Sequence, residues 1–79
     1  MPTPRSVADS AALLLADAEA VNAATSRLRA LARQLRDDPT TPPWFAAVAD
    51  AHLTATTIAA TDLVRAATHL QALSESATR

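Results

Sequence analysis

The 79-residue chain has room for one domain at most and for a small core, because short chains bury proportionally less surface than long ones. It contains no Cys, which excludes disulfides and thiolate chemistry, and its net charge of -1 gives no general attraction to nucleic acid or anionic lipid. With no Gly for a phosphate-binding loop and only two His, the sequence predicts a protein that is not an enzyme and has no cofactor or metal site.

The first predicted helix covers about residues 4–38. It is expected to begin near Pro4 or Ser6, since Ser6 followed by Asp9 resembles a capping box. Pro39 disfavours helical geometry in the residue before it, so the helix should end sharply there.

A heptad repeat runs through this helix. Large apolar residues recur every seven positions, and a small residue follows each of the first four by four positions. The large positions are Val7, Leu14, Val21, Leu28 and Leu35, and the small ones are Ala11, Ala18, Thr25 and Ala32. Such spacing is typical of a helix that packs one narrow face against another helix.

A Pro-rich turn at residues 39–43 leads into a second predicted helix at about residues 42–76. Thr41 is a candidate N-cap, with Pro42 as the first helical residue. This helix has a seam of its own: Ala49, Leu53, Thr56, Ala60, Leu63, Ala67 and Leu70.

The two seams fit each other if the chain folds back at the turn. Large residues then face small ones at most layers, as in Leu14 with Ala67, Ala18 with Leu63, Val21 with Ala60, and Ala11 with Leu70, while Leu28 faces Leu53. The sequence therefore predicts an all-α, antiparallel two-helix hairpin that forms a single domain over residues 1–79. Arg29 and Asp50 should lie side by side on its flank.

Thr25 and Thr56 fall in one layer of this register. Their hydroxyl groups could bond to carbonyls of their own helices, or the polar layer could disfavour slipped pairings of the two helices. The sequence leaves both interpretations open.

Several large apolar residues lie outside the seams, and a lone hairpin cannot cover them all. They are Leu13, Leu15, Leu31, Trp44, Phe45, Val48, Ile58, Val64 and Leu73. Contiguous exposed apolar patches mark interfaces, so we expect the hairpin to pair with a second copy or a related helical protein in a four-helix bundle. The candidate interface residues are Leu31, Trp44, Phe45, Val48, Ile58 and Val64.

Trp44 and Phe45 are the only aromatic residues and lie together at the start of the second helix. They could close the end of the hairpin as a plug, or anchor a partner, since Trp is enriched among interface hot spots.

An alternative function involves Arg29, Arg33 and Arg36, which share one helix face. A small regulator could use such a face to contact nucleic acid or a DNA-bound protein. Asp37, Asp38 and Asp50 lie close by and offset the charge, so a solvated face at a helix C-terminus is the better interpretation. His52 and His69 are too far out of line on one helix to bind a single metal ion without further ligands.

No segment predicts a membrane span. The longest apolar run, from Ala11 to Ala16, is far shorter than the roughly 20 residues a span requires. Asp9 and Asp17 interrupt the N-terminal apolar stretch, which excludes a cleavable secretory signal. We expect a cytoplasmic location by default, with export without such a signal as the alternative.

The segment Trp44-Phe45-Ala46, followed by Ala49 and Leu53, lies where a short turn joins two long predicted helices. This arrangement resembles the WXG100, or ESAT-6-like, proteins, which are small helical hairpins that dimerise and are associated with type VII secretion. The chain departs from the family where Ala46 replaces the motif's Gly, and it has no Tyr for the secretion signal that often follows the second helix. The resemblance implies dimerisation more firmly than export.

Overall fold

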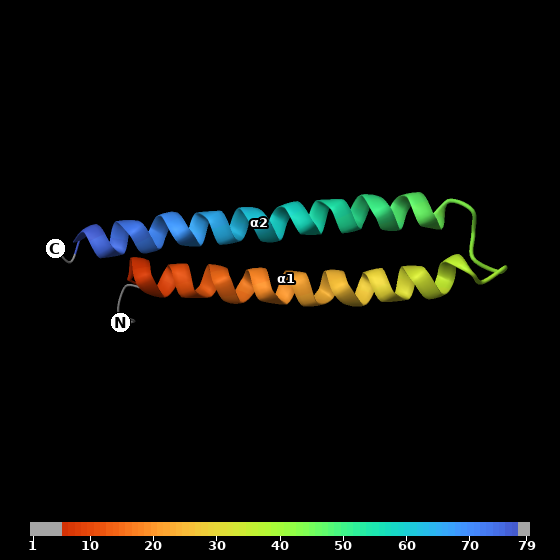
Figure 1. Cartoon of the computed structure of the whole chain (residues 1–79), viewed down its shortest axis with the longest axis horizontal. Helices are drawn as coiled ribbons and strands as arrows, with labels where there is room; N and C mark the ends of the chain where they lie inside the picture. Colours follow the sequence, from red (N-terminus) through yellow and green to blue (C-terminus); the bar gives the residue numbers. More distant parts are fainter. Residues whose placement is uncertain (1–5, 78–79) are drawn as a thin grey trace, which may run out of the picture.

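The computed structural model describes residues 6–77, and these form an antiparallel helical hairpin (Figure 1). Helix α1 spans Val7–Arg36 and helix α2 spans Phe45–Ala77. The turn lies at one end of the molecule, and the start of α1 and the end of α2 lie at the other, in a shape about 60 Å long. The all-α hairpin predicted from the two seams is confirmed.

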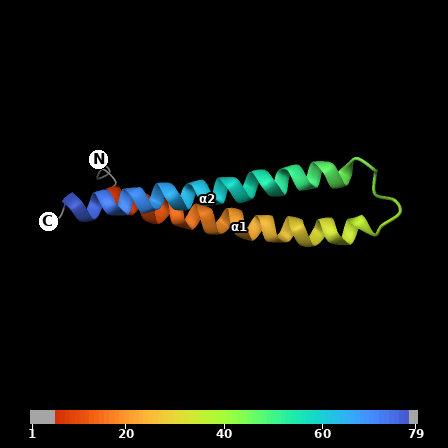
Figure 2. The same ribbon diagram turned by 45° about the horizontal axis from the view of Figure 1, so that its top comes forward.

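The two helices lie side by side over most of their lengths, and the last part of α2 extends past the start of α1 (Figure 1). Seen from a second direction they overlap near the termini and separate near the turn, so their axes cross at a shallow angle (Figure 2). Within residues 6–77, neither helix is apolar enough over a sufficient length to cross a membrane.

Helix α1 begins with Ser6 as its N-cap, which is one half of the predicted capping box. Ser6 has an extended backbone, and its side-chain oxygen accepts a hydrogen bond of 3.0 Å from the backbone N–H of Asp9. The alternative start at Pro4 lies outside the described residues. At its other end α1 stops at Arg36, two residues before the predicted limit at Asp38.

The predicted start of α2 at Pro42 is wrong, because the helix begins at Phe45. Pro43 follows Pro42, and a proline disfavours helical geometry in the residue before it. The Phe45 N–H instead donates to the Pro42 carbonyl at 3.1 Å and closes a turn just before the helix.

Thr41 is likewise not the N-cap of α2. Its hydroxyl donates a 2.7 Å hydrogen bond to the carbonyl of Leu35, one of the four carbonyls at the end of α1 that have no partner within the helix. Its N–H closes a turn at the Asp38 carbonyl, 3.1 Å away. Pro39 occupies the second position of this turn, which proline favours. Thr41 therefore terminates α1 and does not start α2.

Only small side chains are fully enclosed between the helices. The buried residues of the described chain are Ala11, Ala18, Thr25, Ala32, Ala49, Ala60 and Ala67. The large seam residues are half-buried: Leu14, Val21, Leu28, Leu35, Leu53, Leu63 and Leu70. Small side chains let the helix axes approach, and in the predicted register a large residue faces the small one at most layers.

The register predicted from the seams is confirmed at its central layer. The hydroxyl groups of Thr25 and Thr56 are hydrogen-bonded to each other at 2.8 Å, across 31 residues of sequence. Thr25 also lies 2.8 Å from the carbonyl of Val21, and Thr56 lies 3.3 Å from that of Leu53. The two interpretations of this layer are therefore compatible, because each hydroxyl can both donate and accept.

The packing predicts that Ala60→Leu destabilises the hairpin far more than Ala20→Leu. Ala60 is 3% exposed and faces Val21 in the predicted register, whereas Ala20 is exposed on α1. Overpacking costs about 1 to 3 kcal/mol, and each kcal/mol lowers the Tm of a domain this size by about 4 to 8 °C. Thermal melts followed by circular dichroism would measure this, and equal Tm values for the two variants would contradict the register.

Candidate interaction surface

Large apolar side chains are exposed along both helices. Within the described residues, those at least two-fifths exposed are Val7, Leu13, Leu31, Trp44, Val48, Ile58, Val64 and Leu73. Five of the six predicted interface residues belong to this group, and Phe45 is half-buried. Leu15, which also lies outside the seams, is half-buried. Val7 is exposed although it belongs to the first seam.

The six candidate residues do not form one continuous surface. Val64 lines a shallow groove with Asn22, Thr57 and Thr61 on one side of the hairpin. Leu31 comes one residue before the buried Ala32, which places it on the opposite side at 100° per residue. Any single partner helix can therefore contact only part of the set.

The aromatic pair at the turn has separate environments. Phe45 is half-buried and lines a cavity of about 170 Å³ between the ends of the helices. Trp44 is 62% exposed, with its ring centre 6.5 Å from that of Phe45. Phe45 thus closes the turn, and the exposure of Trp44 does not fit the role of a plug.

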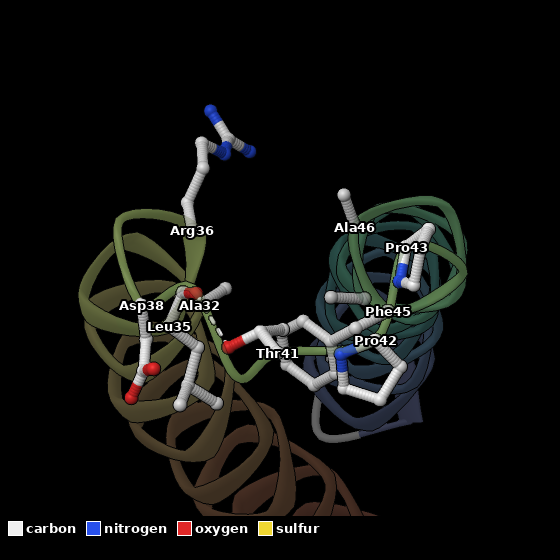
Figure 3. Close-up of a pocket in the computed structure, with 10 residues that line it drawn as sticks. Ala32, Leu35, Arg36, Asp38, Thr41, Pro42, Pro43, Phe45 and Ala46 are labelled. Carbon is white, nitrogen blue, oxygen red and sulfur yellow. Dashed lines mark hydrogen bonds between the residues drawn. The ribbon is translucent and has the colours of Figure 1, made fainter.

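The cavity at the turn has mostly apolar walls. Figure 3 shows it between the ends of α1 and α2, with Arg36 extending away from the space between the helices and Thr41 directed at the Leu35 carbonyl. Its other lining residues are Ala32, Asp38, Pro42, Pro43, Phe45, Ala46 and Ala49. Its volume is below the 300 to 1,000 Å³ typical of sites for drug-sized ligands.

The three Arg of the alternative nucleic-acid face are all exposed. Arg36 forms an ion pair with Asp50 at 3.8 Å, with both side chains more than 60% exposed. Such a pair contributes about 0.2 to 1 kcal/mol. Asp50 thus offsets one of the three positive charges, as the sequence analysis expected for this face.

The predicted pairing of Asp50 with Arg29 is wrong, because Asp50 meets Arg36. Side chains on a helix lean toward its N-terminus. In an antiparallel pair, Arg36 therefore leans away from the turn and Asp50 leans toward it, so the two converge. Arg29 starts on the far side of Asp50 and leans away from it.

His52 and His69 are both exposed on α2. No group of three or more His, Cys, Asp or Glu within residues 6–77 is placed to hold a metal ion.

No protein-family model matches this chain, and no curated protein or solved structure shows significant similarity to it. The resemblance to WXG100 proteins therefore rests on the Trp-bearing turn and the two long helices alone.

The turn itself carries one perturbed ionisable group. The hydroxyl of Thr40 donates to Asp38 Oδ1 at 2.7 Å, and the Thr40 N–H donates to the same oxygen at 2.9 Å. These hydrogen bonds, the hydroxyl contributing most, lower the pKa of Asp38 below its ordinary value of 3.8. Because the pKa of Asp38 is lower in the folded state than in the unfolded state, the two hydrogen bonds stabilise the folded state at pH values above the unfolded-state pKa. That stabilisation is lost as pH falls through the folded-state pKa.

We expect Thr40→Val to raise the pKa of Asp38 toward 3.8 and Thr40→Ser, which keeps the hydroxyl, to leave it lowered. Carboxyl chemical shifts followed by NMR through an acid titration would measure both variants. If Thr40→Val left the titration of Asp38 unmoved, the hydroxyl contact would not be its cause.

Proposed function

We propose that this protein acts as a non-enzymatic interaction module, in which the hairpin associates with a second copy of itself or a related helical hairpin. The observation that carries the proposal is the composition of the interior. Nothing larger than Thr is buried within residues 6–77, while eight large apolar side chains are substantially exposed.

The physical argument follows from that imbalance. Burying apolar surface stabilises by about 25 cal/mol per Å², and the hairpin leaves much of its apolar surface in water. Chains of this size are commonly stabilised by disulfides, metals or association, and this chain has no Cys. Association with another helical pair would supply the missing burial, and a four-helix bundle is the architecture we propose.

The resemblance to WXG100 proteins supports the same proposal. Those proteins are helical hairpins that dimerise, and here two helices of 30 and 33 residues flank a turn with an exposed Trp44. By this resemblance we propose a role related to type VII secretion. The replacement of the motif's Gly by Ala46, which lines the cavity at the turn, is the main departure.

Sedimentation equilibrium at micromolar concentration tests the proposal. We expect a dimer whose association constant changes little as salt is raised, since apolar contacts carry it. A monomer mass over the whole concentration range would contradict self-association. Binding of a DNA duplex that weakens steeply with salt would favour instead the regulator that uses Arg29, Arg33 and Arg36.

The same measurement on two variants tests the role of Trp44. Trp44→Ala should weaken association by about 2 kcal/mol or more, as for a hot spot, with little loss of helix content because the side chain is 62% exposed. Leu73→Ala is the matched control, since Leu73 is equally exposed and lies near the other end of α2. Equal effects of the two substitutions would remove Trp44 as an anchor.

A further inference from the structure

The outer face of α2 carries a second heptad stripe that the hairpin does not use. Its members are Trp44, Val48, Ala51, Ala55 and Ile58, separated by four, three, four and three residues. All five are exposed, and Trp44 and Ile58 are exposed by 62% and 56%. The carbonyl of Trp44 accepts from the Val48 N–H at 3.3 Å, so the helical path extends to Trp44.

This stripe faces away from α1. Ala51 follows the buried Ala49 by two residues, and Ile58 follows Thr56 by two, which turns each about 200° around the helix axis. Spacing of this kind is the pattern by which one helix packs along another. Within the hairpin, however, no helix covers this stripe.

The apolar part of the stripe ends after Ile58. The next positions in the same spacing are Asp62, Arg65 and His69. Asp62 and Arg65 form an ion pair at 3.4 Å. The stripe is therefore apolar over the half of α2 near the turn and charged over the half near the terminus.

We propose that two copies of the chain pair through this stripe, with their α2 helices antiparallel, Trp44 over Ala55 of the partner and Val48 over Ala51 of the partner. The inference rests on the self-association in the proposed function. It replaces the four-helix bundle by an arrangement in which only the two α2 helices meet, because the stripe faces away from α1. A two-fold axis repeats each contact, so the stripe is complementary to itself.

Two features favour a second copy in this orientation. The first is size: the antiparallel register sets a large residue opposite a small one in each of these layers, the rule that the chain follows between α1 and α2. Ile58 then lies beside the partner's turn, just beyond the start of its α2. The overlap from Trp44 to Ala55 is about 16 Å long at 1.5 Å per residue.

The second feature is charge. A parallel pair would stack Asp62 on Asp62 and Arg65 on Arg65, and like charges at a helix interface disfavour that partner. In the antiparallel pair these residues lie beyond the start of the partner's α2.

Engineered cysteines can report whether the two α2 helices are antiparallel, because the natural chain has no Cys. A mixture of Val48→Cys and Ala51→Cys chains should form the mixed disulfide almost exclusively on oxidation, since a disulfide requires Cα atoms about 4.4 to 6.8 Å apart. Ala55→Cys alone should form no disulfide, because the two copies of this residue lie about 16 Å apart along the axis. Rapid disulfide formation by Ala55→Cys, or homodimeric disulfides in the mixture, would overturn the antiparallel pairing.

A second pair of variants tests the contact without oxidation. Ala55→Leu fills the space beneath the partner's Trp44 and should raise the Kd for self-association at least tenfold. Ala72→Leu, on the same outer face but outside the overlap, should leave it within twofold. Both residues are exposed in the hairpin, so circular dichroism should show both variants folded.

The outcomes separate this inference from the proposed function. A wild-type dimer with equal Kd values for Ala55→Leu and Ala72→Leu would overturn the pairing through α2 and leave dimerisation standing. A wild-type monomer would overturn both. Trp44, the single Trp of the chain, gives an independent readout, because its fluorescence should shift to shorter wavelength as the dimer forms.

Discussion

The close approach of the two helices is the constraint on which the rest of this structure depends. Helices can pack near the short end of the usual 8 to 10 Å range where small side chains lie at the contact. The buried Ala11, Ala18, Ala60 and Ala67 meet this requirement, and Thr25 meets it at the layer it shares with Thr56. The large side chains opposite cannot be enclosed in so narrow a space and remain half-buried at its edges.

That arrangement links the fold to the proposed function. An interior of Ala and Thr provides register and proximity, but it removes little apolar surface from water per residue. The surplus is therefore on the outside, at residues such as Leu31, Ile58 and the exposed Trp44. A hairpin built in this way has an energetic reason to associate, and the heptad spacing along the outer face of α2 offers a helix-sized place to do so.

The sequence predicted the parts of the fold that depend on periodicity. The heptad spacing gave both helices and the layer of Thr25 with Thr56, because side-chain direction along a helix follows from position alone. It was wrong where neighbouring residues compete. Pro43 prevents a helix start at Pro42. Because side chains lean toward the helix N-terminus, Asp50 forms its ion pair with Arg36 and not with Arg29. The interface candidates could be predicted as apolar residues left over by the seams. Which of them share one side of the hairpin could not, because that depends on how the two helices are turned toward each other.

The dependence of Tm on protein concentration tests the central claim most directly. If the native hairpin is stabilised by a second copy, binding that occurs only in the folded state shifts the unfolding equilibrium by mass action. The Tm of the wild-type chain should then rise by several degrees for each tenfold increase in concentration above the Kd for self-association. A Tm that stays constant from low micromolar to millimolar concentration would show that the Ala and Thr interior stabilises the hairpin without a second copy of the chain.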